Sequence, residues 1–363
     1  MIVALVIFAV TYALLLALPR RRAWIALASG ALFIALGILP VGDVASAIDW
    51  NVLMMIAGTM SVKILAVGDV CGELGLEFLK ERLKAYKKEN GVDFCVVNGE
   101  NANVVGITPK QADLLLQSGA DVLTLGNHTW TRTELRPYLD ERRKILRPAN
   151  CAPQCPGKGI NVYETPFGDV CVMSLMGRFT LDVNTDNPFV VADSYLQEIK
   201  EKIILVDFHA EGTSEKVAMG WLLNGKVSAV WGTHTHVQTS DACVLPGGTG
   251  YITDLGMTGP SQGVIGIDID QSIGKFFGDP PQRYTSGKGP GKLEGCLFTI
   301  DPETGRCLAA EGIRLTWRKS GMSSRRNMTP SPWPWTPCGK RTASCSAASL
   351  PSWAARPRNT WPP

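Results

Sequence analysis

The sequence predicts an α/β fold for the middle of the chain, residues 60–317, and two observations support this prediction. Short apolar runs of strand length alternate with segments whose apolar residues recur at helical spacing. Polar and charged residues follow directly after several of these runs, where strands would end and loops begin. Alternation of this kind builds a sheet covered by helices, and in such sheets the chemistry gathers at the carboxyl ends of the strands.

Local signals justify each predicted element in turn. Residues 62–70, VKILAVGDV, have the apolar run of a buried strand, and the helical pattern that follows over 72–90 ends at Gly91. After the next strand, Thr108 provides an N-cap and Pro109 the first position of a second helix. Further strands are expected at 121–125, 203–209 and 227–232. The segment 286–292, SGKGPGK, lacks the ending of a P-loop and predicts a flexible loop.

The first 59 residues predict a transmembrane-like hairpin. Residues 1–18 and 23–41 are apolar runs of spanning length, separated by three arginines at 20–22. Because this positive charge follows the first run, the order favours a hairpin with the arginines in the cytosol over a signal peptide. A third apolar run opens at Trp50 and is too short to span.

Residues 1–60 resemble the start of an anion-permease-type transporter. The segment would make the protein membrane-associated if it is present in the native protein. The alternative hypothesis is a fusion artefact, with Met60 as the start of the functional unit. Residues 318–363 contain no Val, Ile, Asp, Glu or His, but eight prolines and four of the ten tryptophans, so they predict a disordered tail.

Charge and cysteine usage limit the classes of partner and compartment. Without the two ends, the middle of the chain has 25 basic and 31 acidic residues, a net charge of −6. Non-specific nucleic-acid binding needs a cationic surface, so no nucleic-acid partner is predicted. The ten cysteines are irregularly spaced and include no CxxC pair, which indicates reduced thiols and a cytoplasmic protein.

Seven polar side chains at the predicted strand ends are candidate metal ligands. The set mixes carboxylate oxygen, amide oxygen and imidazole nitrogen, which suits manganese, iron or zinc better than calcium or magnesium. Seven ligands are too many for one tetrahedral zinc and suit two metals that share a bridging carboxylate. The seven are Asp69, Glu100, Asn101, Asn127, His209, His234 and His236.

Each of these residues alone also has an ordinary explanation. Asp or Asn after a strand is usually a turn or cap residue, and a single His at a strand end is more often a surface or hydrogen-bonded residue than a ligand. His234 and His236 would alternate on a strand or its extension and face the same side, which fits packing as well as metal binding. Their joint occurrence in the strand-end loops of one domain favours the metal site.

The motifs, taken together, resemble those of the calcineurin-like metallophosphoesterases. They are most similar to the YmdB-type branch, whose members hydrolyse cyclic nucleotides, and the likeness covers residues 60–315. The resemblance implies an α/β/β/α sandwich, with two sheets face to face and helices outside. The motifs are Gly68-Asp69, Asn98-Gly99-Glu100-Asn101, Gly126-Asn127-His128, His209 and His234-Thr235-His236.

The sequence departs from the wider superfamily at three positions. Cys71 stands in place of a His, Glu100 in place of an Asp, and Thr129 in place of an acid. In the YmdB-type branch Asn101 replaces the missing His as ligand, so the metal count is retained. We interpret Cys71 as a packing residue, because thiolates suit softer metal sites.

The resemblance also implies a role for each residue. Asp69, Asn101 and His236 would bind one metal, Asn127, His209 and His234 the other, and Glu100 would bridge both. Two divalent ions, iron or manganese with zinc as an alternative, would bind a shared water, lower its pKa and direct the hydroxide at phosphorus. His128 would protonate or stabilise the leaving oxygen.

The expected function is therefore that of a dinuclear-metal phosphodiesterase acting on 2′,3′-cyclic or 3′,5′-cyclic nucleotides. The expected partner is a small-molecule phosphodiester substrate, and the sequence is compatible with a homo-oligomer. Two other classes remain open: a membrane transporter fragment that carries a passenger domain, and a catalytically inactive metal-binding module.

Overall fold

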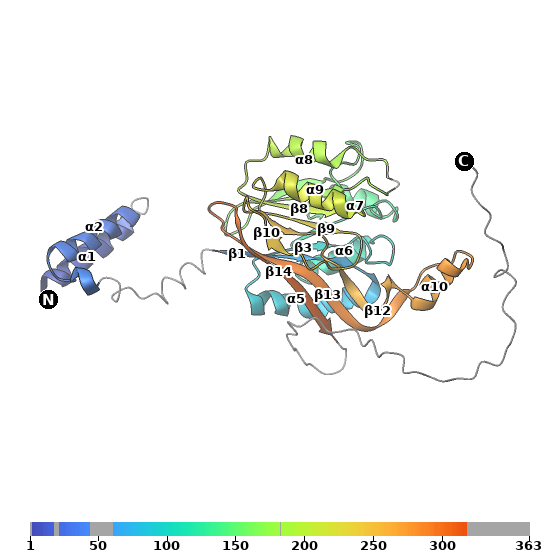
Figure 1. Ribbon diagram of the computed structural model, residues 1–363, viewed down its shortest axis with the longest axis horizontal. Coiled ribbons are helices and arrows are strands. Elements are labelled where there is room, and N and C mark those ends of the chain that lie inside the picture. Colours follow the sequence, from blue (N-terminus) through green and yellow to red (C-terminus); the bar gives the residue numbers. More distant parts are fainter. Residues whose placement is uncertain (1, 18–21, 44–60, 182, 318–363) are drawn as a thin grey trace, which may run out of the picture. The chain divides into compact units, whose positions relative to one another are not determined.

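The computed structural model describes residues 2–17, 22–43, 61–181 and 183–317 (Figure 1). The tail at 318–363 and the apolar run from Trp50 lie outside the described residues. Six helices of the predicted α/β region are α5 (Gly72–Asn90), α6 (Pro109–Gln117), α7 (Leu135–Glu141), α8 (Pro188–Leu196), α9 (Thr213–Leu223) and α10 (Ile269–Phe277).

Two sheets form the centre of this region. The first has the strand order β2-β12-β13-β1-β3-β4-β5, and β14 also pairs with β13. Its strands are β1 (Val62–Val67), β2 (Asp69–Val70), β3 (Phe94–Asn98), β4 (Val122–Thr124), β5 (Ile145–Leu146), β12 (Met257–Ile267), β13 (Ser286–Ile300) and β14 (Cys307–Trp317). The second sheet has the order β10-β11-β9-β8-β7-β6. Its strands are β6 (Ile160–Tyr163), β7 (Val170–Met176), β8 (Ile203–His209), β9 (Ala229–Thr233), β10 (Cys243–Val244) and β11 (Gly250–Ile252).

Three clusters of buried apolar side chains show how the layers pack. The central cluster joins the facing sides of the two sheets, and in it the rings of Trp231 and Phe298 stack with their centres 5.8 Å apart. A second cluster packs α5 and α6 against the first sheet, with Leu83 and Leu115 fully buried. A third packs α8 and α9 against the second sheet. The predicted α/β fold is confirmed as a sandwich of two sheets with helices on both outer faces (Figure 1).

Individual signals from the sequence are also confirmed. Thr108 caps α6 in a capping box with Gln111, and Gly91 ends α5 in the left-handed conformation at φ 63°. The eight cysteines among the described residues are free. The expectation of a flexible loop at 286–292 is wrong, because this glycine-rich segment is the beginning of β13 and pairs with both β12 and β14.

The expected transmembrane-like hairpin is not found as a pair of spanning helices. Residues 2–35 contain α1 (Ile2–Ala17) of 16 residues and α2 (Arg22–Ala35) of 14 residues, joined by a 2.8 Å hydrogen bond between the hydroxyls of Thr11 and Ser29. A 16-residue helix is about 24 Å long at ~1.5 Å per residue, and a hydrocarbon core is about 30 Å thick. None of the helices in the described part of the chain has the length and apolar character needed to span a bilayer.

Candidate metal centre

Strand ends from both sheets position the candidate ligands. Asp69 lies in β2, Glu100 and Asn101 follow β3, and Asn127 follows β4, all in the first sheet. From the second sheet, His209 is the last residue of β8 and His234 follows β9. Because β3 and β4 are parallel, as are β8 and β9, their carboxyl ends meet at one edge of each sheet. The structure brings all seven predicted ligands together.

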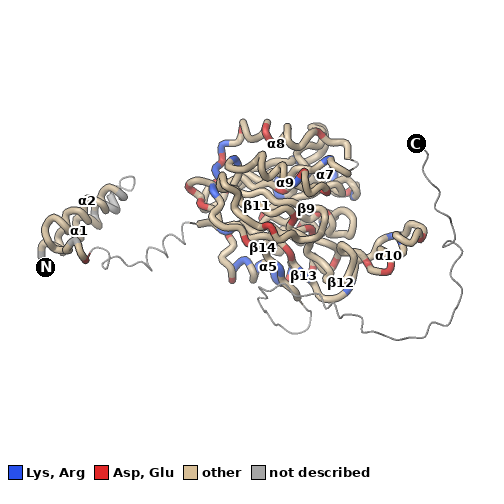
Figure 2. Tube along the Cα trace, viewed as in Figure 1, with Lys and Arg blue, Asp and Glu red and all other residues tan. Residues whose placement is uncertain are grey.

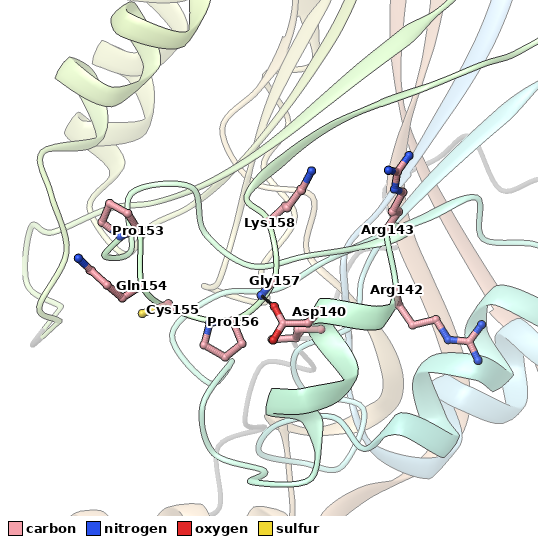
Figure 3. A pocket seen from close by; sticks show the side chains of 10 residues that line it. Asp140, Arg142, Arg143, Pro153, Gln154, Cys155, Pro156, Gly157 and Lys158 are labelled. Atoms are coloured by element: carbon pink, nitrogen blue, oxygen red, sulfur yellow. Dashed lines mark hydrogen bonds between the residues drawn. The ribbon is translucent and has the colours of Figure 1, made fainter.

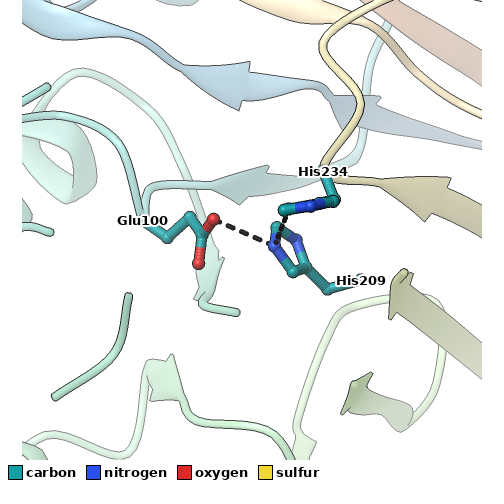
Figure 4. Close-up of side chains that lie close together, drawn as sticks. All are labelled: Glu100, His209 and His234. Atoms are coloured by element: carbon teal, nitrogen blue, oxygen red, sulfur yellow. Dashed lines mark hydrogen bonds and ion pairs between the residues drawn. The ribbon is translucent and has the colours of Figure 1, made fainter. Parts of the chain in front are cut away.

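Three potential ligand atoms converge on Nε2 of His209. Oδ1 of Asn127 and Oε1 of Glu100 both lie 2.9 Å from this nitrogen, and Nδ1 of His234 lies 3.1 Å from it. Figure 4 shows Glu100 and the two imidazoles facing one another. A ring nitrogen carries at most one proton, so it cannot donate to all three neighbours. The ligand atoms of Glu100, His209 and His234 all lie within 4.8 Å of one another, a spacing that fits a divalent metal ion.

A second group surrounds Asp69. Nε2 of His236 lies 3.8 Å from Oδ1 of Asp69 and 3.1 Å from Nδ2 of Asn101. Asp69 is fully buried, and its Oδ1 has no hydrogen-bond partner, whereas Oδ2 accepts from the backbone N–H of His234 at 3.1 Å. A buried carboxylate oxygen without a partner is costly unless a cation binds it, so this atom also fits a metal ligand.

Glu100 lies between the two groups. Its Oε1 contacts Nε2 of His209 at 2.9 Å in the first group and Nδ2 of Asn101 at 3.2 Å in the second. Its Oε2 accepts from the backbone N–H of His128 at 3.1 Å. Asn101 presents its amide nitrogen to both Glu100 and His236, so binding a metal through Oδ1 requires a rotation of this amide.

The outer nitrogen of each clustered imidazole contacts a group that the sequence analysis did not identify. Nδ1 of His209 lies 2.9 Å from the hydroxyl of Thr233, Nε2 of His234 lies 3.1 Å from a carboxylate oxygen of Glu211, and Nδ1 of His236 lies 2.8 Å from the carbonyl of Ile265. Contacts of this kind fix the tautomer of a ligating imidazole. The inner nitrogens, which face the other candidate ligands, are then available for metal.

The backbone of His234 and His236 corrects one expectation. The two residues do not alternate along a strand, because β9 ends at Thr233 and both adopt positive φ, 99° and 62°. Positive φ is strained for residues with a side chain and clusters at functional sites. Asp254 holds this loop by accepting from the hydroxyl of Thr235 at 2.7 Å and from the buried ammonium of Lys216 at 2.6 Å.

Burial and the neighbouring charges shift the pKa values of the cluster. Burial raises the pKa of Asp69 to about 6, although His236 and His209 oppose this shift. Burial acts in the same direction on Glu100, but the charge and hydrogen bond of His209 outweigh it and lower the pKa of Glu100 to about 2. Burial lowers the pKa of His234 to about 3.

His128 and Cys71 lie beside the cluster. Nε2 of His128 is 3.5 Å from Nδ2 of Asn127, and burial lowers the pKa of this half-buried imidazole. Sγ of Cys71 is buried and lies 3.5 Å from Nδ1 of His236, the outer nitrogen that also faces the Ile265 carbonyl. Cys71 is nearer to this outer nitrogen than to Nε2, at 3.9 Å, which agrees with its interpretation as a packing residue.

A hollow elsewhere on the domain contains none of the predicted site residues. It lies between the C-terminal end of α7 and the loop at 153–158, and it is lined by Asp140, Arg142, Arg143 and Lys158 among others (Figure 3). Basic and acidic residues are interspersed along the trace of the domain (Figure 2). Among the described residues, the predicted site residues therefore lie in the strand-end cluster and not in this hollow.

Comparisons with known proteins identify the family. Residues 65–313 match the family model described as YmdB-like protein. A 2′,3′-cyclic-nucleotide 2′-phosphodiesterase of Bacillus subtilis (strain 168) is 42% identical over 257 residues, which are 70% of this chain and 97% of that protein. These matched segments do not support the expectation that residues 1–60 resemble a transporter.

Two solved structures share the fold. A crystal structure of a hypothetical protein from Thermus thermophilus has a TM-score of 0.67 at 36% identity, covering 71% of this chain and 100% of that chain. A crystal structure of a novel phosphatase from Mycoplasma pneumoniae has a TM-score of 0.68 at 32% identity, covering 71% of this chain and 94% of that chain. The chain belongs to the YmdB-like protein family.

Proposed function

We propose that residues 60–317 form a metal-dependent phosphodiesterase that hydrolyses cyclic nucleotides, with 2′,3′-cyclic nucleotides as the first candidates and 3′,5′-cyclic nucleotides as the second. The observation that carries the proposal is the cluster itself, in which a buried oxygen of Asp69 without a hydrogen-bond partner and the converging atoms around His209 match the ligands of divalent metals. The named activity of the Bacillus subtilis relative supports the substrate class.

Two groups of ligands support a dinuclear centre. Asn127, His209 and His234 would hold one ion, and Asp69, Asn101 and His236 the other. Glu100 would bridge them, since its Oε1 contacts a member of each group. Bound divalent ions activate water and neutralise charge on the phosphoryl oxygens. Manganese or iron fits this mixed nitrogen and oxygen set, with zinc as the alternative.

The protein's own groups supply positioning and proton chemistry. Glu100 accepts from the backbone N–H of His128, and the imidazole of His128 lies beside the amide of the candidate ligand Asn127. We assign His128 to the leaving oxygen of the phosphodiester, which its imidazole would protonate or stabilise by a hydrogen bond. The lowered pKa of His128 favours the neutral ring, which still donates one N–H.

The test is hydrolysis of 2′,3′-cyclic AMP and 3′,5′-cyclic AMP by the full chain, with and without added Mn²⁺. We expect Mn²⁺-dependent turnover that falls by at least about 100-fold in Glu100→Gln, because one substitution removes a ligand from both groups. Glu294→Gln is the matched control, since Glu294 is also a buried carboxylate but pairs with Lys292 and Arg314 instead of the cluster. If the protein is folded and loaded with Mn²⁺ but hydrolyses neither substrate, the phosphodiesterase proposal is contradicted and a metal-binding module is the only function that remains supported.

A further inference from the structure

A buried hydrogen-bonded network lies at Nδ1 of His209, the ring nitrogen opposite Nε2, and the nearest candidate ligand on this side is Asp69, whose Oδ1 is 3.9 Å from Nδ1. Nδ1 of His209 is 2.9 Å from Oγ1 of Thr233, and this hydroxyl donates to Oδ1 of Asp207 at 2.7 Å. The second oxygen of Asp207 accepts from the hydroxyl of Thr124 and, at 3.2 Å, from Nδ2 of Asn98. Asp207, Thr233 and Thr124 are completely buried, so water cannot replace these partners.

The network determines which nitrogen of His209 carries hydrogen. A threonine hydroxyl has one hydrogen, and an ionised carboxylate can only accept. Since Thr233 gives its hydrogen to Asp207, its oxygen can only accept from His209. Nδ1 then carries a hydrogen, and Nδ2 of Asn98 adds longer contacts of 3.3 Å to the Thr233 oxygen and 3.5 Å to Nδ1. In the neutral ring, which is the form that binds a metal, Nε2 therefore has the free lone pair. Nε2 is the atom on which Asn127, Glu100 and His234 converge.

We propose that Asp207 and Thr233 are positioning residues, which hold His209 as its Nδ1–H tautomer and so present Nε2 to a divalent cation. This inference rests on the metal-dependent function proposed above. In metal sites generally, a ligating imidazole donates its other N–H to a carboxylate or carbonyl. Here the hydroxyl of Thr233 lies between the imidazole and the carboxylate. Asp207 determines the direction of the hydroxyl hydrogen, and this direction determines which form of the ring Thr233 can bind.

Two substitutions at Thr233 separate the hydroxyl from the shape of the side chain. Thr233→Val keeps the branched shape and removes the hydroxyl, whereas Thr233→Ser keeps the hydroxyl. Asp207→Asn replaces an acceptor-only group by one that can donate to Thr233, so the hydroxyl would turn toward His209 and disfavour Nδ1–H. Thr249→Val is the matched control, because the buried Thr249 hydroxyl donates to the Val227 carbonyl at 2.6 Å and contacts no histidine.

The experiment measures the affinity of the full chain for Mn²⁺ alone by the loss of the free-ion electron paramagnetic resonance signal, with the melting temperature measured in parallel. We expect Thr233→Val and Asp207→Asn to bind Mn²⁺ about 10–100-fold more weakly than the wild type. Thr233→Ser should bind within about threefold of the wild type, which is the rescue that a hydroxyl-mediated role requires. Thr249→Val should lower the melting temperature without changing the Mn²⁺ affinity.

Three results would overturn the inference. Thr233→Val with wild-type Mn²⁺ affinity would show that the hydroxyl does not position His209, and Thr233→Ser as weak as Thr233→Val would show that packing accounts for the effect. A wild type that binds no Mn²⁺ would contradict both this inference and the proposed function. Mn²⁺ binding with the expected pattern of variants but no turnover would contradict the proposed function alone.

Discussion

Gly126→Ala tests whether the position of the His209 ring determines activity. Gly126 precedes Asn127, and a Cβ at this position would lie 2.2 Å from Cδ2 and 2.4 Å from Nε2 of His209. Carbon atoms in contact are normally about 3.5–4.0 Å apart. The new methyl group would therefore displace the imidazole by at least about 1 Å. The fully buried ring cannot avoid the methyl group by turning into solvent, so the ring itself shifts and its contact with Thr233 is strained.

The displacement moves Nε2, the atom on which the other ligands converge. A misplacement of 1 Å in a catalytic group costs about 100-fold in rate, so we expect kcat for 2′,3′-cyclic AMP to fall by about this factor. Overpacking a core costs about 1–3 kcal/mol of unfolding free energy, so the variant should still fold. Steady-state hydrolysis with saturating Mn²⁺ measures the first effect, and urea denaturation measures the second.

Gly312→Ala is the control for this experiment. A Cβ at Gly312 would meet no atom closer than 3.9 Å, so the same substitution should leave both rate and stability unchanged. Wild-type turnover by a correctly folded Gly126→Ala variant would refute the reasoning, because it would show that His209 can move by about 1 Å without consequence.

The same geometry leads to three further predictions. Burial raises the pKa of Asp69 to about 6, so its carboxyl is protonated below that pH in the metal-free protein. Against the effect of burial, the neighbouring carboxylates raise the pKa of His209, and Cys71 and Asp69 raise that of His236, so protons compete with metal at these residues as well. The Mn²⁺ affinity measured by calorimetry should therefore fall by at least about tenfold as the pH drops from 6 to 5; a constant affinity over this range would contradict Asp69 as a ligand. Lys216→Met removes the ammonium that lies 2.6 Å from the buried carboxylate of Asp254. The free energy of unfolding measured in urea should then fall by about 3–5 kcal/mol, because a buried charge is left unpaired. A loss below about 1 kcal/mol would show that the pair is not desolvated. Mn²⁺ at 100 times its dissociation constant adds about 2.7 kcal/mol to the free energy of unfolding. Removal of the metal with EDTA should therefore lower the melting temperature by about 5–10 °C; an unchanged melting temperature would argue that the native state holds no metal.

The sequence was sufficient to predict the elements that carry the cluster. Strand β8 ends at His209 as its apolar run indicated, and α6 begins at the capping box that Thr108 signalled, because both signals are local. His234 and His236 were predicted as ligand candidates, but the positive φ of their backbone was not predicted. Their positive φ depends on partners far along the chain, such as Asp69, which accepts from the His234 N–H, and Asp254, which accepts from Thr235.

The outer contacts of the imidazoles could not be predicted from the sequence for a related reason. Asp207 is an acid inside an apolar strand run, and this was the one signal that could have identified it, since a buried carboxylate requires partners. Those partners come from three other strands, and only the pairing of the strands reveals them. Ile265 gives no signal at all, because it acts through its backbone carbonyl.

The origin of the ligands in two different sheets links the stability of the fold to its chemistry. Asp69, Glu100 and Asn127 come from the first sheet and His209 and His234 from the second, so neither sheet alone holds a complete set. The distance between the two sets is fixed by the apolar layer between the sheets, in which Trp231 stacks on Phe298. Since interiors are close-packed, a change of side-chain volume in this layer is transmitted to the spacing of the sheets. We therefore expect a change of side-chain volume in the inter-sheet core to alter the spacing of the candidate ligands.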